Sequence, residues 1–301
     1  MRIALATAFA PVALLFAQSI ASVSYERIEG VEGASSPVLS NDGRKLIYGS
    51  TSAPGLWLLD LATNEVVCVS SAVGADRGAT FGNDGSRVVY RESFDAGAEL
   101  LYALAAYDVR TGEREFFGSP RRDVGPPIVT NAGSLYYIED NNAVLKTRYD
   151  DVGDGRRAAL VAALDEEIYL RLGGLGARLA PFGELPYAQP TLSNRQRFLA
   201  FVVRRMGAFV MDVESKRVVA SFSDADFPTF SADESVVIFR KRNERKKYEL
   251  YYAPSLGGVA RPLLPESAPE VFTPSSPRER DEIVFADEAG LVYIIDFETT
   301  E

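Results

Sequence analysis

A short phrase recurs along this chain and limits the folds open to it. The segment 37–44, Pro-Val-Leu-Ser-Asn-Asp-Gly-Arg, returns at 190–197 as Pro-Thr-Leu-Ser-Asn-Arg-Gln-Arg. Looser copies begin at Ala79, Pro127, Pro228 and Glu270, so that successive copies are separated by 42, 48, 63, 38 and 42 residues. Spacings of this size are typical of the blades of a β-propeller. The sequence therefore predicts a repeat protein with six copies of one unit.

Each copy has the same internal order of strands and turns. In the second copy, residues 83–85 (Asn-Asp-Gly) form a tight hairpin signal between two short runs rich in β-branched and aromatic residues. A longer apolar run at 100–107 is followed by a second turn at 108–113 and by a further apolar pair. Four short antiparallel strands make one blade, so we predict an all-β fold, a six-bladed β-propeller of four-stranded blades.

The sixth copy lacks its last strand. The chain reaches Glu301 within the sixth version of the second turn, 296–301. An incomplete blade would expose the unpaired edge of a sheet, which invites aggregation. Residues 25–28 (Tyr-Glu-Arg-Ile) precede the first copy at the place where other fourth strands stand. We therefore expect this N-terminal strand to complete the last blade and close the ring.

Acidic residues begin the second turns, at Asp60, Asp108, Asp212 and Asp296. We interpret them as turn residues that accept hydrogen bonds from backbone N–H groups, because Asp commonly does so at the start of a turn. The acidic segment 150–155 does not fit a calcium loop. Val152 and Val161 would stand at its third and twelfth positions, where oxygen ligands are required. We read residues 151–156 as the second turn of the third copy.

The repeat also resembles a known family. The pattern Pro-x-Leu-Ser-Asn-Asp-Gly-Arg-x-Leu-x-Tyr over 37–48, together with the turn at 60–65, is similar to the WD-like repeat of TolB-like six-bladed β-propellers. The resemblance covers nearly all of the chain after Ser35. It concerns the propeller part of TolB only, since we expect no room here for the additional N-terminal α/β domain. The shared residues build the blades, so the resemblance implies a fold and transfers no binding residue.

The N-terminal segment has the pattern of a secretory signal peptide. Arg2 supplies a positive charge, residues 3–17 form a short apolar run, and residues 19–21 (Ser-Ile-Ala) offer small residues for cleavage. A retained anchor is the alternative, but the run is shorter than the ~20 residues that span a bilayer. We expect a signal peptide at 1–21 and a single propeller domain at 22–301. The mature protein would be periplasmic or secreted, without an integral membrane segment.

Charge and residue usage exclude several classes of function. The chain carries a net charge of −10, which becomes −11 when Arg2 is lost with the signal peptide. This balance disfavours a nucleic-acid partner, because binding phosphates requires a basic surface. The absence of histidine excludes Ser-His-Asp and Cys-His catalysis and His-ligated metals. The single Cys68 is expected to pack as a small apolar residue.

The predicted innermost strands carry little ionisable chemistry. They read Pro-Val-Leu-Ser, Ala-Thr-Phe-Gly, Pro-Ile-Val-Thr, Pro-Thr-Leu-Ser, Pro-Thr-Phe-Ser and Glu-Val-Phe-Thr, in which only Glu270 is acidic. We therefore expect no catalytic residue, metal or cofactor, and favour a non-catalytic module that binds or assembles envelope components. The alternative is a carboxylate-based hydrolase or lyase, with or without calcium, whose site lies at the channel mouth. Whether the chain is an enzyme stays open at this point.

The long spacing between the third and fourth copies indicates an insertion at about 158–186. The excess is too small for a complete seventh blade. We expect a short helix at 158–167 and a flexible turn at 173–176 (Gly-Gly-Leu-Gly).

One loop is strongly basic in this acidic chain. It joins the second and third strands of the fifth copy, and such loops share a face of the disc with the variable crossings between blades. We expect a protein or other envelope component, acidic in character, to bind there; the alternative is a solvated hairpin. The expected contacts are Arg240, Lys241, Arg242, Arg245, Lys246 and Lys247.

Overall fold

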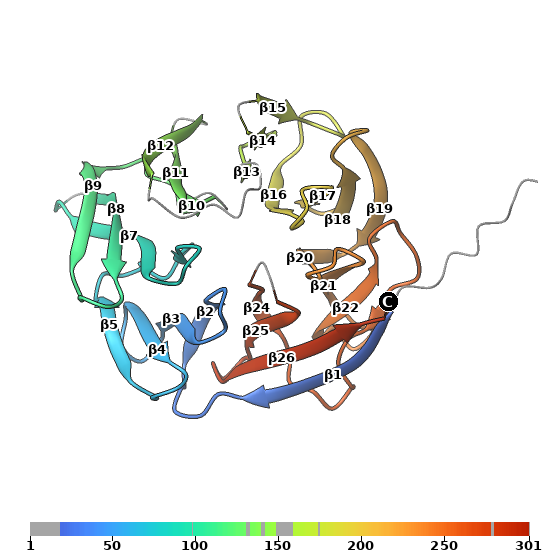
Figure 1. Cartoon of the computed structure of the whole chain (residues 1–301), viewed down its shortest axis with the longest axis horizontal. Coiled ribbons are helices and arrows are strands. Elements are labelled where there is room, and N and C mark those ends of the chain that lie inside the picture. The colour runs from blue at the N-terminus through green and yellow to red at the C-terminus, as the bar shows by residue number, and fades with distance from the viewer. Residues whose placement is uncertain are drawn as a thin grey trace, which may run out of the picture.

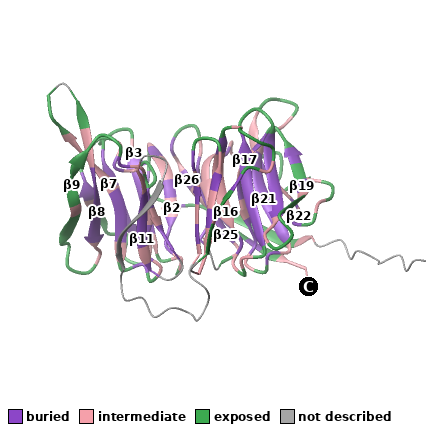
Figure 2. Cartoon of the chain, turned by 90° about the horizontal axis from the view of Figure 1, so that it is seen from above, coloured by how far each residue is buried: buried purple, intermediate pink, exposed green. Residues whose placement is uncertain are grey.

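The chain forms antiparallel β-sheets arranged radially around a common axis (Figure 1). The computed structural model describes residues 19–97, 99–130, 133–139, 142–148, 159–173, 175–277 and 280–300. These residues contain strands and turns and no helix, and hence no helix able to cross a membrane. In each sheet the buried residues occupy the middle of the strands, and the exposed residues lie at the connections and on the outermost strands (Figure 2).

Each of the six repeats supplies one sheet, which we call blades 1 to 6 in chain order. Blade 1 consists of β2 (Ala34–Leu39), β3 (Lys45–Ser50), β4 (Leu56–Asp60) and β5 (Val66–Ser70). Blade 2 consists of β6 (Thr80–Phe81), β7 (Arg87–Asp95), β8 (Leu100–Asp108) and β9 (Arg114–Arg121). Blade 3 consists of β10 (Pro127–Val129), β11 (Ser134–Glu139) and β12 (Asn142–Arg148).

The other three blades follow the same antiparallel order. Blade 4 consists of β16 (Tyr187–Leu192), β17 (Phe198–Val203), β18 (Gly207–Asp212) and β19 (Arg217–Ser223). Blade 5 consists of β20 (Ala225–Phe230), β21 (Val236–Arg242), β22 (Tyr248–Pro254) and β23 (Arg261–Pro262). Blade 6 consists of β24 (Phe272–Ser275), β25 (Glu282–Ala286), β26 (Val292–Thr299) and the N-terminal strand β1 (Ile20–Arg27).

A further sheet stands between blades 3 and 4, built from the segment predicted as an insertion. It consists of β13 (Ala159–Ala163), β14 (Ile168–Leu172) and β15 (Leu175–Leu179). The expected helix at 158–167 is therefore wrong for its described residues, since Ala159–Ala163 is a strand. Each of the six repeats supplies one blade, as predicted, and the described residues of this segment add a three-stranded sheet, because they pair with one another rather than with β12.

Closure by the N-terminal strand is confirmed. β1 pairs with β26 along its length, from Ile20 opposite Thr299 to Arg27 opposite Tyr293. The strand is longer than the expected 25–28 and begins inside the predicted signal peptide. The turn expected at 296–301 is absent from its described part, because residues 296–299 continue β26. The partner strand arrives from the other end of the chain, so no hairpin turn is needed there.

The sixth repeat begins four residues later than the sequence alignment places it. In blade 5 Thr229, which follows Pro228, is opposite Ile238, and in blade 1 Val38 is likewise opposite Ile47. In blade 6 the residue in this position is Ser275, opposite Val284. Pro274 therefore replaces Glu270 as the start of the copy. Glu270 precedes the inner strand, and its Oε1 accepts a 2.9 Å hydrogen bond from the Tyr248 backbone N–H.

The acidic turn residues make the predicted backbone contacts. Asp60 Oδ1 accepts from the N–H groups of Ala62 and Thr63 at 3.0 and 3.1 Å. Asp108 and Asp212 make equivalent bonds in blades 2 and 4. These bonds favour the ionised carboxylates and hold the pKa values of Asp60, Asp108 and Asp212 below the ordinary value. The structural interpretation is confirmed for these three residues and is wrong for Asp296, which lies within β26 and begins no turn.

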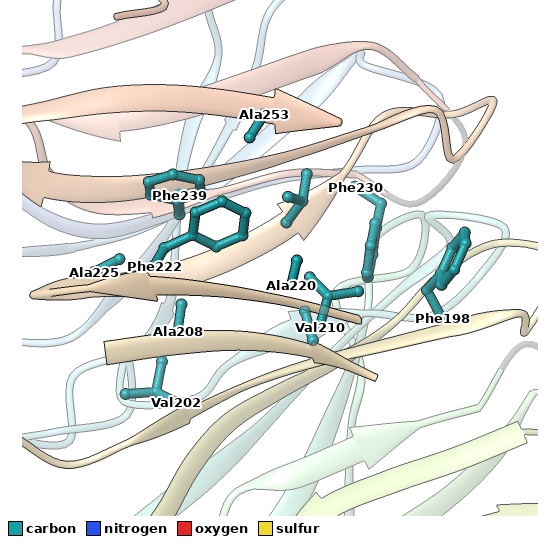
Figure 3. Close-up of a cluster of buried hydrophobic side chains, with 12 residues drawn as sticks. Phe198, Val202, Ala208, Val210, Ala220, Phe222, Ala225, Phe230, Phe239 and Ala253 are labelled. Atoms are coloured by element: carbon teal, nitrogen blue, oxygen red, sulfur yellow. The ribbon is translucent and has the colours of Figure 1, made fainter. Parts of the chain in front are cut away.

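The core consists of apolar clusters between neighbouring blades rather than one central mass. Between blades 4 and 5, Phe222 and Phe239 stack with ring centroids 4.3 Å apart, and Phe198 stacks with Phe230 at 6.1 Å (Figure 3). Truncating such a buried Phe to Ala costs about 3–5 kcal/mol. Each blade is therefore stabilised chiefly by its neighbours, so an open ring loses an entire interface. Cys68, opposite Trp57, is half-buried on β5.

Candidate binding site in the central channel

The innermost strands of several blades enclose a cavity of about 640 Å³. Its wall is formed by β10, β13, β16 and β20, together with the turns that follow β16, β20 and β24. These strands lie nearest the axis of the ring (Figure 1). The lining residues are Gly125, Pro126, Ile128, Ile138, Ala159, Val161, Ala162, Ala163, Pro190, Thr191, Leu192, Ser193, Asn194, Gln196, Thr229, Phe230, Ser231, Ser276 and Pro277.

The cavity wall is neutral. Its polar groups are hydroxyls and amides, and none of its lining residues is ionisable. Thr191 and Thr229 are half-buried, and their hydroxyls make no hydrogen bond within the described residues. Ser193 and Ser231 are buried. Their hydroxyl oxygens already accept hydrogen bonds from the backbone N–H groups of Phe198 and Val236, at 2.9 and 3.1 Å. The two threonines are thus the hydroxyls best placed to meet a ligand.

Turn-to-turn hydrogen bonds fix the geometry of the channel mouth. The amide of Asn41 donates to the carbonyl oxygen of Asn83 at 3.1 Å, and Asn83 donates in turn to that of Thr130 at 2.8 Å. Between blades 4 and 5, Asn194 donates to the carbonyl oxygen of Ala232 at 3.2 Å. Blade 6 joins the series on both sides: Asp281 accepts from the Ala232 N–H at 2.6 Å, and Arg280 donates to the Asp42 carbonyl oxygen at 3.0 Å. The repeated Asn of the phrase therefore connects blades.

The six residues of the predicted basic site lie in different environments in the structure. Arg240 lies in β21 and is 8% exposed, so its expected role as a surface contact is wrong. It forms a bidentate ion pair with Asp226, at 2.7 and 2.6 Å, and its guanidinium lies over the rings of Phe227 and Tyr248. Asp226 is its cross-strand partner on β20. Arg240 thus joins strands within blade 5.

Two more of the predicted residues have partners within the chain. Arg245 forms an ion pair with Glu266, and the Lys247 ammonium donates to the backbone carbonyls of Glu266 and Ala268. The loop itself is an ordered hairpin in which Asn243 accepts from the Lys247 N–H at 3.0 Å. Lys241, Arg242 and Lys246 are the remaining cations, and Arg242 lies over the Tyr248 ring. Within the described residues, these three make no ion pair.

In the described part of the structure, no carboxylate lines the central cavity. No group of three or more Asp, Glu or Cys residues there is arranged to hold a metal ion. The acidic residues 150, 151 and 154 lie outside the described residues. The acidic and amide side chains that the hydrolase alternative requires from different blades do not converge on the described cavity wall, where Asn194 and Gln196 come from the same turn.

Sequence reasoning identified part of this cavity and missed the rest. The inner-strand motifs at 190–193 and 228–231 were recognisable, and their hydroxyl and apolar residues do line it. The contribution of Ala159–Ala163 was missed because an alanine-rich run without the repeat phrase suggests a helix. An inner strand needs small side chains near the crowded axis, and this packing outweighs the local preference.

Comparisons with known proteins agree with this architecture. No protein-family model matches the chain, and no curated protein does. The β-propeller domain of Cps50 (Swd1) from Myceliophteria thermophila is 15% identical, with a TM-score of 0.59 over 90% of this chain and 99% of that one. TolB from Acinetobacter baumannii is 17% identical, with a TM-score of 0.50 over 88% of this chain. The match spans 57% of that TolB.

An enzyme is also among the similar structures. An oligogalacturonate lyase in complex with manganese is 14% identical, with a TM-score of 0.51 over 89% of this chain and 78% of that one. In all, 936 chains match, so the fold alone does not distinguish one function from another. At these identities the likeness shows the fold alone: this chain folds as a β-propeller.

Proposed function

We propose that this chain is an exported, non-catalytic β-propeller that binds a protein or other component of the cell envelope, in the periplasm or after secretion. The observation that carries the proposal is the neutral wall of the central cavity. Proton transfer and metal binding require ionisable side chains, whereas hydroxyls, amides and apolar groups are suited to holding a ligand. The N-terminal signal-peptide pattern supports export.

The ligand group that enters the cavity is uncharged. A charged group would lose its hydration there without meeting an opposite charge on the described wall, and this loss is costly. A neutral polar segment, by contrast, can hydrogen-bond to Thr191 and Thr229 and pack against Ile128, Val161 and Phe230. The volume of about 640 Å³ is sufficient for a few residues of a peptide or a similar group.

A second contact involves the basic loop, in which Arg242 and Lys246 are exposed and Lys241 is half-buried. Lys241, Arg242 and Lys246 attract an acidic surface of the partner, and this attraction chiefly increases the rate of association. Arg240 is excluded from this contact because its guanidinium is buried and paired with Asp226. The Lys247 ammonium is bound to backbone carbonyls, whereas the ion pair of Arg245 with Glu266 is exposed and leaves Arg245 accessible. The proposed partner thus has a neutral segment and an acidic surface.

The proposed binding role of the central cavity is tested by filling the cavity with larger side chains. The wild-type chain without its predicted leader and a Thr191→Tyr/Thr229→Tyr variant are immobilised and exposed to the same envelope extract. A Thr63→Tyr/Thr111→Tyr variant is the matched control, since it adds the same two rings at exposed turns. A component retained by the wild type and the control, and lost by the channel variant at an unchanged melting temperature, is the expected result.

Two results would overturn the proposal. Equal capture by all three proteins would show that the channel does not bind the partner. Hydrolysis or elimination of a glycan or lactone by the purified chain, abolished when one carboxylate is replaced by its amide, would establish the carboxylate enzyme instead.

A further inference from the structure

A second pocket lies at the seam where the ring closes. It has a volume of about 410 Å³ and is formed by β1, β25, β26 and the turn before β25. None of its lining residues belongs to the wall of the central cavity. The lining residues are Ser22, Ser24, Arg280, Asp281, Glu282, Asp296, Phe297 and Glu298. Four carboxylates and one guanidinium therefore share this pocket.

One carboxylate is buried without a complete set of partners. Glu282 is 6% exposed and lines the pocket. Its Oε1 forms an ion pair with Arg280, whereas its buried Oε2 has no hydrogen-bond partner. A buried acceptor that lacks a donor costs about 1–3 kcal/mol, and more when it is charged. The folded protein therefore contains one buried carboxylate oxygen, Glu282 Oε2, that accepts no hydrogen bond.

A like charge stands directly opposite. Glu282 on β25 is the cross-strand partner of Asp296 on β26, and Asp296 is the partner of Ser24 on β1. Carboxylates facing each other across a sheet repel. Burial raises the pKa of the Glu282 carboxyl; Arg280 opposes this shift and Asp296 adds to it. The negative charge at the seam is thus only partly compensated by the chain itself.

Most of the other polar groups of the pocket already have partners within the chain. Arg280 is engaged by Glu282 and by the carbonyl oxygen of Asp42. Ser22 donates to Glu298 at 3.1 Å. Asp281 accepts from Ala232, and burial together with the nearby Asp233 raises the pKa of Asp281 as well. Apart from the exposed hydroxyl of Ser24, the described pocket offers no uncommitted donor, so a cationic donor would have to come from outside the chain.

We propose that this pocket binds the cationic end of a lysine or arginine side chain presented by a partner protein. An ammonium carries three N–H donors and a guanidinium five, which can reach acceptors on separate strands. A metal ion fits less well, because within the described residues no three acidic groups converge on one point. The bound cation would touch β25, β26 and β1 together and so hold the closing strand in place.

The probe for this site is a hexalysine peptide, titrated calorimetrically at low salt. The Asp296→Asn/Glu298→Gln variant removes two exposed carboxylates from the pocket while leaving buried Glu282 in place. The control, Glu113→Gln/Glu288→Gln, removes two exposed carboxylates elsewhere and so matches the change in net charge. We expect about tenfold weaker binding for the pocket variant and less than about twofold for the control, since two charge-assisted hydrogen bonds are lost only in the former.

Melting temperatures provide a second readout. Hexalysine should raise the melting temperature of the wild type and of the control, because a ligand that binds only the folded protein stabilises it. The pocket variant should show little rise. Both readouts are independent of the channel variants, so failure here leaves the proposed channel function standing.

Three outcomes would overturn this inference. Equal weakening by both double variants would mean that hexalysine responds to net charge alone. Displacement of hexalysine by millimolar magnesium, with stabilisation that depends on Asp296 and Glu298, would identify a metal site. If the melting temperature of the wild type rises at acidic pH but not on addition of hexalysine, Glu282 and Asp296 share a proton instead.

Discussion

The side-chain amide of Asn83 donates a 2.8 Å hydrogen bond to the backbone carbonyl oxygen of Thr130 and so joins the turn of blade 2 to that of blade 3. The bond is partly buried, and Asn83 is itself bonded through its carbonyl oxygen to Asn41. A hydrogen bond of this kind contributes about 1 kcal/mol. The repeated Asn thus couples the turns of blades 1, 2 and 3 in series.

Replacing Asn83 by Ala should destabilise the protein by about 1 kcal/mol, because the Thr130 carbonyl loses its donor. The midpoint of urea unfolding measures the change. Asn83→Asp keeps the size of the side chain but turns an acceptor towards the carbonyl, so it should cost at least as much. Identical midpoints for the wild type and Asn83→Ala would show that the bond contributes nothing.

Deleting residues 23–29 should lower stability substantially and promote aggregation. The deletion removes most of β1 and exposes the edge of β26, which then offers unpaired N–H and C=O groups to other chains. Thermal melting and light scattering measure the two effects. A truncated chain that melts like the full-length domain would contradict closure by this strand.

Stability should fall as the pH rises through the range in which Glu282 ionises. The pKa of Glu282 is raised in the folded protein, so its contribution is complete below the unfolded value and is lost as the pH rises through the folded value. Asp60 and Asp108 have lowered pKa values, and their contributions are lost only at more acidic pH. The two effects therefore occupy separate ranges of pH.

Asp296→Asn should raise the melting temperature at neutral pH and flatten its dependence on pH above the ordinary pKa of Glu, because the charge opposite Glu282 is removed. Melting curves from pH 4 to pH 8 measure this, with Glu288→Gln as the control for net charge. A lower melting temperature for Asp296→Asn at neutral pH would refute the repulsion.

Calcium should leave the melting temperature unchanged. The described residues hold no set of three acidic groups placed for a metal ion, and a metal that bound the folded state would raise the melting temperature. Melting is compared with millimolar calcium and with chelator. A rise with calcium that the chelator reverses would favour the carboxylate enzyme.

Charge reversal of the basic loop should slow association with the partner. The variant changes Lys241, Arg242 and Lys246 to Glu, and the control changes the exposed Arg44, Arg110 and Lys216 of the repetitive turns in the same way. Because electrostatic steering acts on the encounter, the rate should fall in the loop variant and, for the wild type, with rising salt. The test uses the component captured through the channel; equal rates for wild type and loop variant would leave the loop a solvated hairpin.

Most of the fold was predictable from the sequence because the repeat phrase specifies turns. The Asn-Asp-Gly signals and the Asp residues of the second turns act through local hydrogen bonds, so their geometry is set by a few neighbouring residues. The β13–β15 sheet was not predictable in this way. Residues 159–163 lack the phrase, and among the described strands they pair with β14 alone, a choice that depends on the space left in the ring.

The candidate sites were less predictable because they depend on contacts between strands. Arg240 and Asp226 are fourteen residues apart in sequence and meet across β20 and β21, so the basic run gave no sign that one of its members is buried. Glu282 and Asp296 likewise face each other only in the paired sheet. The neutral inner strands, by contrast, were visible in the repeated phrase itself.

The pairing of Ile20 with Thr299 has a consequence for the order in which the protein can fold. Of the described strands, β1 is synthesised before all the others and β26 after them, so blade 6 cannot close until β26 has been made. Blades 1 to 5 pair strands that are close in sequence and can form earlier. Blade 6 requires the pairing of β1 with β26, which are far apart in sequence, and such a contact is slow to form. Until then β1 and β26 present open strand edges. We therefore expect the pairing of β1 with β26 to be the last step in the folding of the ring, and the stage at which the protein is most exposed to aggregation.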